Sequence, residues 1–190
     1  PKSPAEIFAA GEQNDVPLIT GFTRDESASP LKGAVTTSDF QAKAKDLFGD
    51  HAEAFLKLYP VKTDAEVALA ATEAGRDAGM QQAARIHAQA QAKNGKAPAF
   101  VYMFGRKHPY VADPRIADQD PKTIGAYHTS DVPYWFQNLD IYNWLRPTRD
   151  WTAWDRTLTG AMSDALIAFA KTGDPSTPTM KWPKYDPAKE

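Results

Sequence analysis

The chain contains no cysteine, which excludes disulfide bonds, a thiol nucleophile and cysteine-ligated metal within its 190 residues. It also lacks an uninterrupted apolar run of about 18 residues, so no segment has the composition of a membrane-spanning helix. The net charge of −2 gives no basic surface of the kind that binds nucleic acid or anionic membranes. We therefore expect neither a nucleic-acid partner nor a membrane span.

The remaining composition is that of an ordinary globular protein. Hydrophobic residues make up 42% of the chain and charged residues 24%, and the length suffices for one domain with a core. The 15 prolines and 11 glycines are spread between the periodic segments. This distribution favours a loop-rich protein over a helical bundle.

Two apolar segments, residues 16–21 and 99–104, are rich in β-branched or aromatic side chains and predict buried strands. Helical periodicity predicts a long helix over about 77–93 and a last helix over about 154–172. Shorter helices are predicted by the capping-box spacings Ser38/Gln41, Asp50/Glu53 and Thr63/Glu66. The strand–helix–strand order predicts a parallel sheet. Two strands are few for so many helices, so the sheet is expected to be incomplete.

The segment 124–139 holds the first candidate for chemistry. His128 lies among small residues with Asp131 close behind it, and bulky aromatics that include Trp135 and Phe136 follow. A histidine that such neighbours hold in one orientation can act as a general base. The alternative is a histidine that only forms a hydrogen bond within a loop.

The other histidines and a cluster of tryptophans are expected to be structural. His87 is expected to pack on its helix, and His108, in a proline-containing loop, to lie at the surface. Trp144, Trp151 and Trp154 fall in one short span, and we expect their large rings to be buried.

A candidate acid, Glu26, follows the first predicted strand. It lies in the loop beyond the strand's carboxyl end, where ligands and chemistry gather in open α/β sheets. A solvated surface carboxylate is the alternative. Acid before histidine is the chain order of α/β-hydrolase triads, in which a serine in a G-x-S-x-G turn comes first. No serine of this chain has glycines at that spacing.

Three motifs carry a resemblance to a known family. Residues 16–26 (VPLITGFTRDE) resemble its VP…G…DEG segment, and residues 125–134 (GAYHTSDVPY) resemble its GAFHGSELPY segment. Residues 169–175 (FAKTGDP), followed by a WP pair and a tyrosine, resemble its FAKTGDP…WP.Y ending. The chain thus resembles the C-terminal portion of the type B carboxylesterases, the cholinesterase-like branch of the α/β-hydrolases. The similarity covers essentially the whole chain, in order.

The resemblance implies an α/β fold and an esterase reaction. Residues 1–190 would be the C-terminal part of a single carboxylesterase catalytic domain, an α/β-hydrolase whose sheet is incomplete without its N-terminal part. That N-terminal part of the same enzyme would be the partner that carries the nucleophilic serine and the oxyanion loop. The substrate would be a small-molecule carboxylic ester, with no metal or other cofactor. The chain alone would be inactive.

The resemblance also assigns roles to residues. Glu26 would be the acid of a Ser–Glu–His triad and His128 its base. Asp131 would fix the loop or a water near the site. Trp135 and Phe136 would line the acyl or alcohol pocket, although a role in the core is an equal alternative.

The chain departs from the family pattern at three positions. Ser27 and Thr129 stand where glycine is common, and Asp131 stands where a glutamate, longer by one methylene, is common. These changes bear on pocket geometry rather than on the reaction. Two other interpretations remain open: a non-catalytic, cholinesterase-like binding or adhesion protein, and an independent α-rich domain with no link to esterases.

Overall fold

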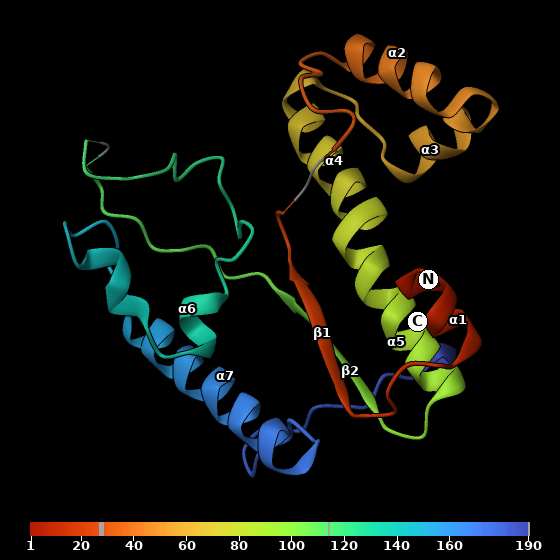
Figure 1. Ribbon diagram of the computed structural model, residues 1–190. Helices are drawn as coiled ribbons and strands as arrows, with labels where there is room; N and C mark the ends of the chain where they lie inside the picture. The colour runs from red at the N-terminus through yellow and green to blue at the C-terminus, as the bar shows by residue number, and fades with distance from the viewer. Residues whose placement is uncertain (27–28, 114, 190) are drawn as a thin grey trace. The chain divides into compact units, whose positions relative to one another are not determined.

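The computed structural model describes residues 1–26, 29–113 and 115–189. The chain divides into two compact units, the first made of Pro1–Arg24 and Ala83–Glu190 and the second of Asp25–Gln82. The α-helices and strands, labelled in Figure 1, are α1 (Pro4–Ala10), β1 (Leu18–Thr23), α2 (Thr37–Phe48), α3 (Ala52–Leu58), α4 (Asp64–Arg76), α5 (Gln82–Asn94), β2 (Ala99–Phe104), α6 (Val132–Trp135) and α7 (Ala153–Thr172). A π-helical turn, Asp77–Gln81, precedes α5, and short 3₁₀ turns span Gly49–His51, Leu139–Asn143 and Pro187–Lys189.

The first unit is built on the strand pair β1 and β2, which run parallel in the register Leu18↔Ala99 to Thr23↔Phe104. The predicted parallel sheet is therefore confirmed, and β2 has the predicted bounds. β1 begins later than expected, directly after Pro17, because proline has no N–H to donate to a neighbouring strand.

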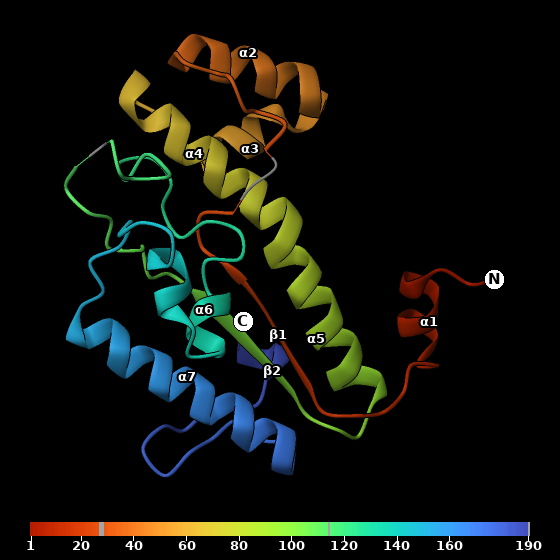
Figure 2. The ribbon, with the colours of Figure 1, turned by 60° about the vertical axis from the view of Figure 1, so that its left-hand side comes forward.

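Helices cover both faces of this strand pair: α5 lies on one side, and α7 with α6 lies on the other (Figures 1 and 2). The ring of Phe169 in α7 meets the ring of Phe100 in β2 edge-on, with centroids 6.3 Å apart. α5 buries Ala84, Ala88 and Gln91. Ile86 on the same helix is 45% exposed, so the helical periodicity that predicted this helix does not mark its buried face throughout.

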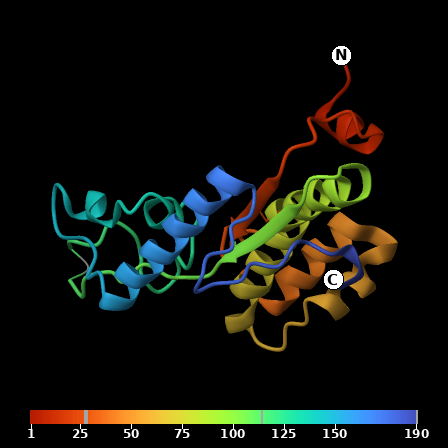
Figure 3. The ribbon, with the colours of Figure 1, turned by 90° about the horizontal axis from the view of Figure 1, so that it is seen from below.

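The C-terminal tail lies along the edge of β2 that faces away from β1 (Figure 3). α7 ends at Thr172 and is capped by Gly173, whose φ of 75° is the left-handed conformation common at helix C-termini. Beyond it, the backbone N–H of Tyr185 donates to the carbonyl of Ala99 at 2.8 Å. The indole N–H of Trp182 donates to the carbonyl of Val101 at 3.2 Å. The tail therefore occupies this edge of the sheet.

The second unit is helical, with α2, α3 and α4 around a small apolar core. Its buried residues are Leu31, Phe40, Val67, Ala70, Ala71 and Ala74. The Thr63/Glu66 capping box of α4 is confirmed, because the Glu66 carboxylate accepts from the Thr63 N–H at 3.1 Å. α2 instead uses Thr36 and Asp39, and α3 follows a 3₁₀ turn without a side-chain cap.

The prediction that three clustered tryptophans are buried is wrong for two of them. Trp144 is 79% exposed and Trp154 is 57% exposed, whereas Trp151 packs beside the core residues of the first unit. Trp154 is the second residue of α7 and there lies under the Arg106 guanidinium, 5.2 Å from the ring centre. Position in the helix, rather than ring size, decides its exposure.

Within the described residues, no helix is both long and apolar enough to cross a bilayer. The same part of the chain holds no group of three histidine, aspartate or glutamate side chains placed to bind a metal ion.

Candidate active site

The His128 loop, residues 125–131, connects a long irregular segment to the start of α6. Its ends are buried, with Ala126 and Ser130 both at 0% exposure, while His128 between them is exposed. The Ser130 N–H donates to the Tyr127 carbonyl at 2.9 Å, which closes a turn under the histidine. The loop therefore exposes the His128 imidazole to solvent on a turn whose two ends are buried.

Thr129, next to the histidine, has a left-handed backbone with φ of 69°. This conformation brings the side chain of an L-residue against its own carbonyl and is strongly disfavoured for a β-branched residue. It explains why the resembled family commonly has glycine here. The surrounding structure must therefore hold this turn in place against local strain.

Asp131 is one fixed point of the loop. Its side chain is 8% exposed, and its Oδ2 atom accepts hydrogen bonds from the Tyr102 hydroxyl at 2.9 Å and the Trp135 indole N–H at 3.1 Å. Tyr102 lies on β2 opposite Gly21 of β1, and a Cβ at Gly21 would collide with the Tyr102 ring. The glycine in β1 thus makes room for the tyrosine that reaches the loop.

His108 is the second fixed point, and the prediction that it lies at the surface is wrong. It is only 4% exposed and is enclosed by the rings of Tyr127, Tyr134, Tyr142 and Trp151. Its Nε2 atom lies 2.8 Å from the Ser130 carbonyl oxygen. Burial lowers the pKa of His108 to about 4, so the imidazole is neutral near pH 7.

A buried arginine supports His108 from the other side. Arg149 Nε donates to His108 Nδ1 at 3.2 Å, and its guanidinium pairs with Asp118 at 2.6 Å. The same guanidinium stacks over the rings of Tyr110 and Tyr142. Because the Arg149 side chain is fully buried and Asp118 is one-third exposed, the pair links the histidine environment to the surface.

Asp155, the first-turn acid of α7, ties α6 and α7 to the segment after β2. It is fully buried and accepts from Arg106, Tyr134 and Thr152 at 2.6 to 2.9 Å. Burial raises its pKa, but these hydrogen bonds outweigh burial and hold the pKa well below its usual range. The Thr152–Asp155 capping-box spacing is the sequence signal that identifies this residue as a cap.

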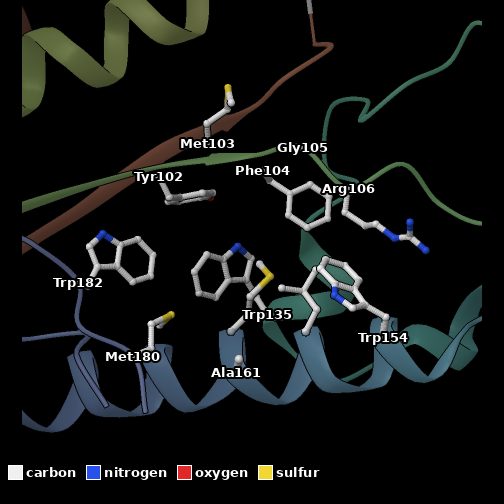
Figure 4. Close-up of a pocket in the computed structure, with 12 residues that line it drawn as sticks. Tyr102, Met103, Phe104, Gly105, Arg106, Trp135, Trp154, Ala161, Met180 and Trp182 are labelled. Carbon is white, nitrogen blue, oxygen red and sulfur yellow. The ribbon is translucent and has the colours of Figure 1, made fainter. Parts of the chain in front are cut away.

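The two aromatics predicted for a pocket lie in different surroundings. Trp135 is 9% exposed and lines an apolar cavity of about 280 Å³ between β2 and α7, beside Tyr102 and Trp182 (Figure 4). Phe136 is 68% exposed and lines a hollow of about 400 Å³ that includes Thr129. Only the second hollow includes a residue of the His128 loop.

The predicted site residues divide between the two units. His128, Asp131, Trp135 and Phe136 belong to the first unit, and Asp131 and Trp135 are brought into direct contact. Glu26 belongs to the second unit, a few residues after β1, and is 8% exposed. Ser27 lies outside the described residues. The pairing of Glu26 with His128 stays a prediction.

The sequence of the whole chain decides the family. A sequence model of the Carboxylesterase family matches residues 1–190. The chain belongs to this carboxylesterase family. The match covers the chain from end to end, which excludes the interpretation as an unrelated helical domain. Among curated carboxylesterase relatives, para-nitrobenzyl esterase of Bacillus subtilis (strain 168) is 29% identical over 97% of this chain and 35% of its own length.

Other relatives are also esterases or hydrolases by name. Fumonisin B1 esterase of Sphingopyxis macrogoltabida is 28% identical and phenmedipham hydrolase of Pseudarthrobacter oxydans 27% identical, with 95% and 99% of this chain covered. A solved thermophilic PNB esterase aligns with a TM-score of 0.64 and 28% identity over 97% of this chain. The fold is therefore that of part of an α/β-hydrolase. This carboxylesterase chain spans about a third of the length of the curated relatives it matches.

Proposed function

We propose that this chain supplies the acid and the base, but not the nucleophile, of a Ser–Glu–His triad in a serine carboxylesterase. Residues 1–190 are the C-terminal part of its catalytic domain, and both compact units belong to that domain. The observation that carries the proposal is the His128 loop. It lies within a chain that matches the family throughout, and it exposes one histidine on a turn whose two ends are buried.

The reaction is a two-step acyl transfer. A serine from the N-terminal part of the same enzyme attacks the ester carbonyl carbon, and His128 accepts the proton of its hydroxyl. When the adduct collapses, the bond to the alcohol breaks and the alcohol oxygen takes that proton from His128. A water, deprotonated by the same imidazole, then attacks the acyl-enzyme and releases the carboxylic acid and the serine.

Two further groups stabilise charge in these steps. Glu26 holds the imidazole in its productive tautomer and stabilises the imidazolium without being protonated itself. Backbone amides in the N-terminal part bind the oxyanion, and each such donor contributes about 3–4 kcal/mol in comparable enzymes. Since both the serine and these amides come from the N-terminal part, the chain alone is inactive.

Phe136, rather than Trp135, lines the substrate pocket in this proposal. Phe136 projects beside the hollow that Thr129 borders, next to the proposed base. Trp135 is buried and bonded to Asp131, which suits a supporting role. Phe136→Ala is therefore expected to raise KM for bulky esters more than for acetate esters.

The direct test is hydrolysis of a short-chain aryl ester by the full-length protein and its variants. His128→Ala is expected to lower kcat at least about 1,000-fold, because removing a triad member leaves only the oxyanion hole and binding. Glu26→Gln is also expected to lower kcat, because the amide cannot stabilise the imidazolium as the carboxylate does. His87→Ala is the matched control, since this exposed histidine stacks on Phe8, with ring centroids 5.0 Å apart, away from the His128 loop.

Full activity of His128→Ala would contradict the proposal. A full-length protein without measurable hydrolysis, and unaffected by the substitution, would favour the binding or adhesion alternative. The 190-residue chain assayed by itself should show no hydrolysis above buffer.

A further inference from the structure

We propose that His108 is a positioning residue that holds the His128 loop in its reactive conformation through the Ser130 carbonyl. This inference rests on the proposed function of His128 for its kinetic consequences. The contact that carries it is the 2.8 Å approach of His108 Nε2 to the Ser130 oxygen. Ser130 lies two positions after the proposed base, so its carbonyl belongs to the turn that carries the imidazole.

The partners of His108 allow only one protonation state. The Ser130 carbonyl can only accept, so the proton must be on Nε2. Arg149 Nε can only donate, so Nδ1 must present its lone pair. A proton on Nδ1 would face the Arg149 N–H directly. The surroundings therefore fix the neutral Nε2–H tautomer, which is the form that donates to the loop.

His108 is itself held rigidly. Arg149 is anchored by Asp118 and by the Thr148 carbonyl at 3.3 Å, and Asn143 accepts from the N–H of Arg149 at 2.9 Å. The Tyr127 hydroxyl lies 3.2 Å from His108 Nδ1 and donates to the Tyr142 hydroxyl at 3.3 Å. Tyr127 and Ser130 both belong to the His128 loop. The contacts of His108 with these two residues therefore hold the turn on both sides of His128.

The loop needs such an anchor because its conformation is strained at Thr129, where φ is 69°. Asp131, on the far side of Ser130, is fixed separately by Tyr102 and Trp135. Without His108 the buried Ser130 carbonyl loses a donor, and the turn can relax toward an extended backbone. His128 would then leave its position while Asp131 stays bonded.

A kinetic comparison in the full-length protein tests this role. His108→Leu removes the donor and keeps the site apolar, and kcat is expected to fall about 10- to 100-fold with KM changed less than about threefold. His108→Gln keeps a donor and an acceptor on one side chain and is expected to restore most of kcat. Phe104→Leu is the control, because it weakens the adjoining core without removing a hydrogen bond to the loop.

Amide hydrogen exchange separates this inference from the proposed function. His108→Leu is expected to accelerate exchange in residues 127–131, whereas Phe104→Leu and His108→Gln are not. Loss of activity in His108→Leu and equally in Phe104→Leu, without faster exchange in the loop, would overturn the positioning role. If His128→Ala keeps activity, the proposed function fails, and the exchange data still decide whether His108 holds the loop.

Nitrogen NMR of the unsubstituted protein supplies a measurement that needs no variant to fold. Long-range proton–nitrogen correlations of the His108 ring are expected to show a protonated Nε2 and an unprotonated Nδ1 at pH 7. Observation of the Nδ1–H tautomer, or of a ring that averages between tautomers, would contradict the inference.

Discussion

His108 and His128 lie in the same unit and in neighbouring loops, yet their environments are opposite. His108 is 4% exposed, enclosed by aromatic rings and bonded at both nitrogens. His128 is exposed on a turn whose ends are buried. Under the proposed function, this comparison teaches that chemistry and support fall to different histidines. A base must reach solvent and substrate, whereas the residue that places it must be shielded from both.

The largest expected effect is on the free energy of unfolding, when the buried network around His108 is broken. Arg149→Met removes the charge that faces His108 and leaves Asp118 without its partner. We expect a loss of about 3 kcal/mol in the free energy of unfolding, near the lower end for breaking a buried pair, because Asp118 is one-third exposed. Arg146→Met, on the same segment but exposed, is the control and should change stability by less than about 0.5 kcal/mol. Equal effects from both substitutions, measured by chemical denaturation, would show that the buried network is not special.

The pH dependence of stability sharpens the same contrast. The folded-state pKa of His108 is about 4, below its ordinary value of 6.5, because burial disfavours the imidazolium. The unfolded chain therefore binds more protons between these values, and stability is lost as pH falls from about 6.5 to about 4, by up to about 3 kcal/mol. The low pKa of Asp155 acts only at lower pH, below the ordinary carboxyl value.

Variants assign this acid sensitivity to one histidine. His108→Gln cannot titrate and should flatten the stability profile between pH 6.5 and 4, as measured by thermal unfolding across that range. Phe104→Leu, which removes no titratable group, is the control and should leave the slope as it is. An unchanged slope in His108→Gln would contradict the assignment of this acid sensitivity to His108.

The smallest expected effect is at Thr129. Thr129→Gly relieves the left-handed strain of about 1–2 kcal/mol but adds freedom to the unfolded chain, so a net gain of about 0.5–1 kcal/mol is expected. Thr157→Gly, in the exposed helical interior of α7, should destabilise by about 0.5–1 kcal/mol. Opposite signs in thermal unfolding support the strain, and a loss at both positions argues that Thr129 is relaxed.

Local patterns predicted the elements well where one residue type decides the outcome. β2 is found at its predicted bounds because a short run of aromatic and β-branched residues between turn residues favours a buried strand over other structures. The end of α7 at Gly173 follows from a positive φ that glycine tolerates. The start of α3 was predicted wrongly, because a 3₁₀ turn replaces the side-chain cap that Asp50/Glu53 spacing suggested.

The candidate site was predictable only in part. The motif around His128 predicts an orientable loop histidine that serves as the base, and that assignment stays a prediction. The role of His108 depends on contacts with Ser130 and Arg149, each more than 20 residues away in the chain. Its neighbour Pro109 suggested a surface loop, and burial by four distant rings overrides that local signal. Long-range packing of this kind leaves no periodicity in the sequence.

The C-terminal tail bonds to the carbonyls of Ala99 and Val101, so it limits the pairing of a further strand with that edge of β2. In the described part of the chain, β1 pairs only with β2, so backbone groups for a new strand are presented on one side alone. That side of β1 is where further strands of an α/β-hydrolase sheet can pair. In the proposed enzyme, strands of the N-terminal part would therefore continue the sheet from β1, while the tail lies along β2.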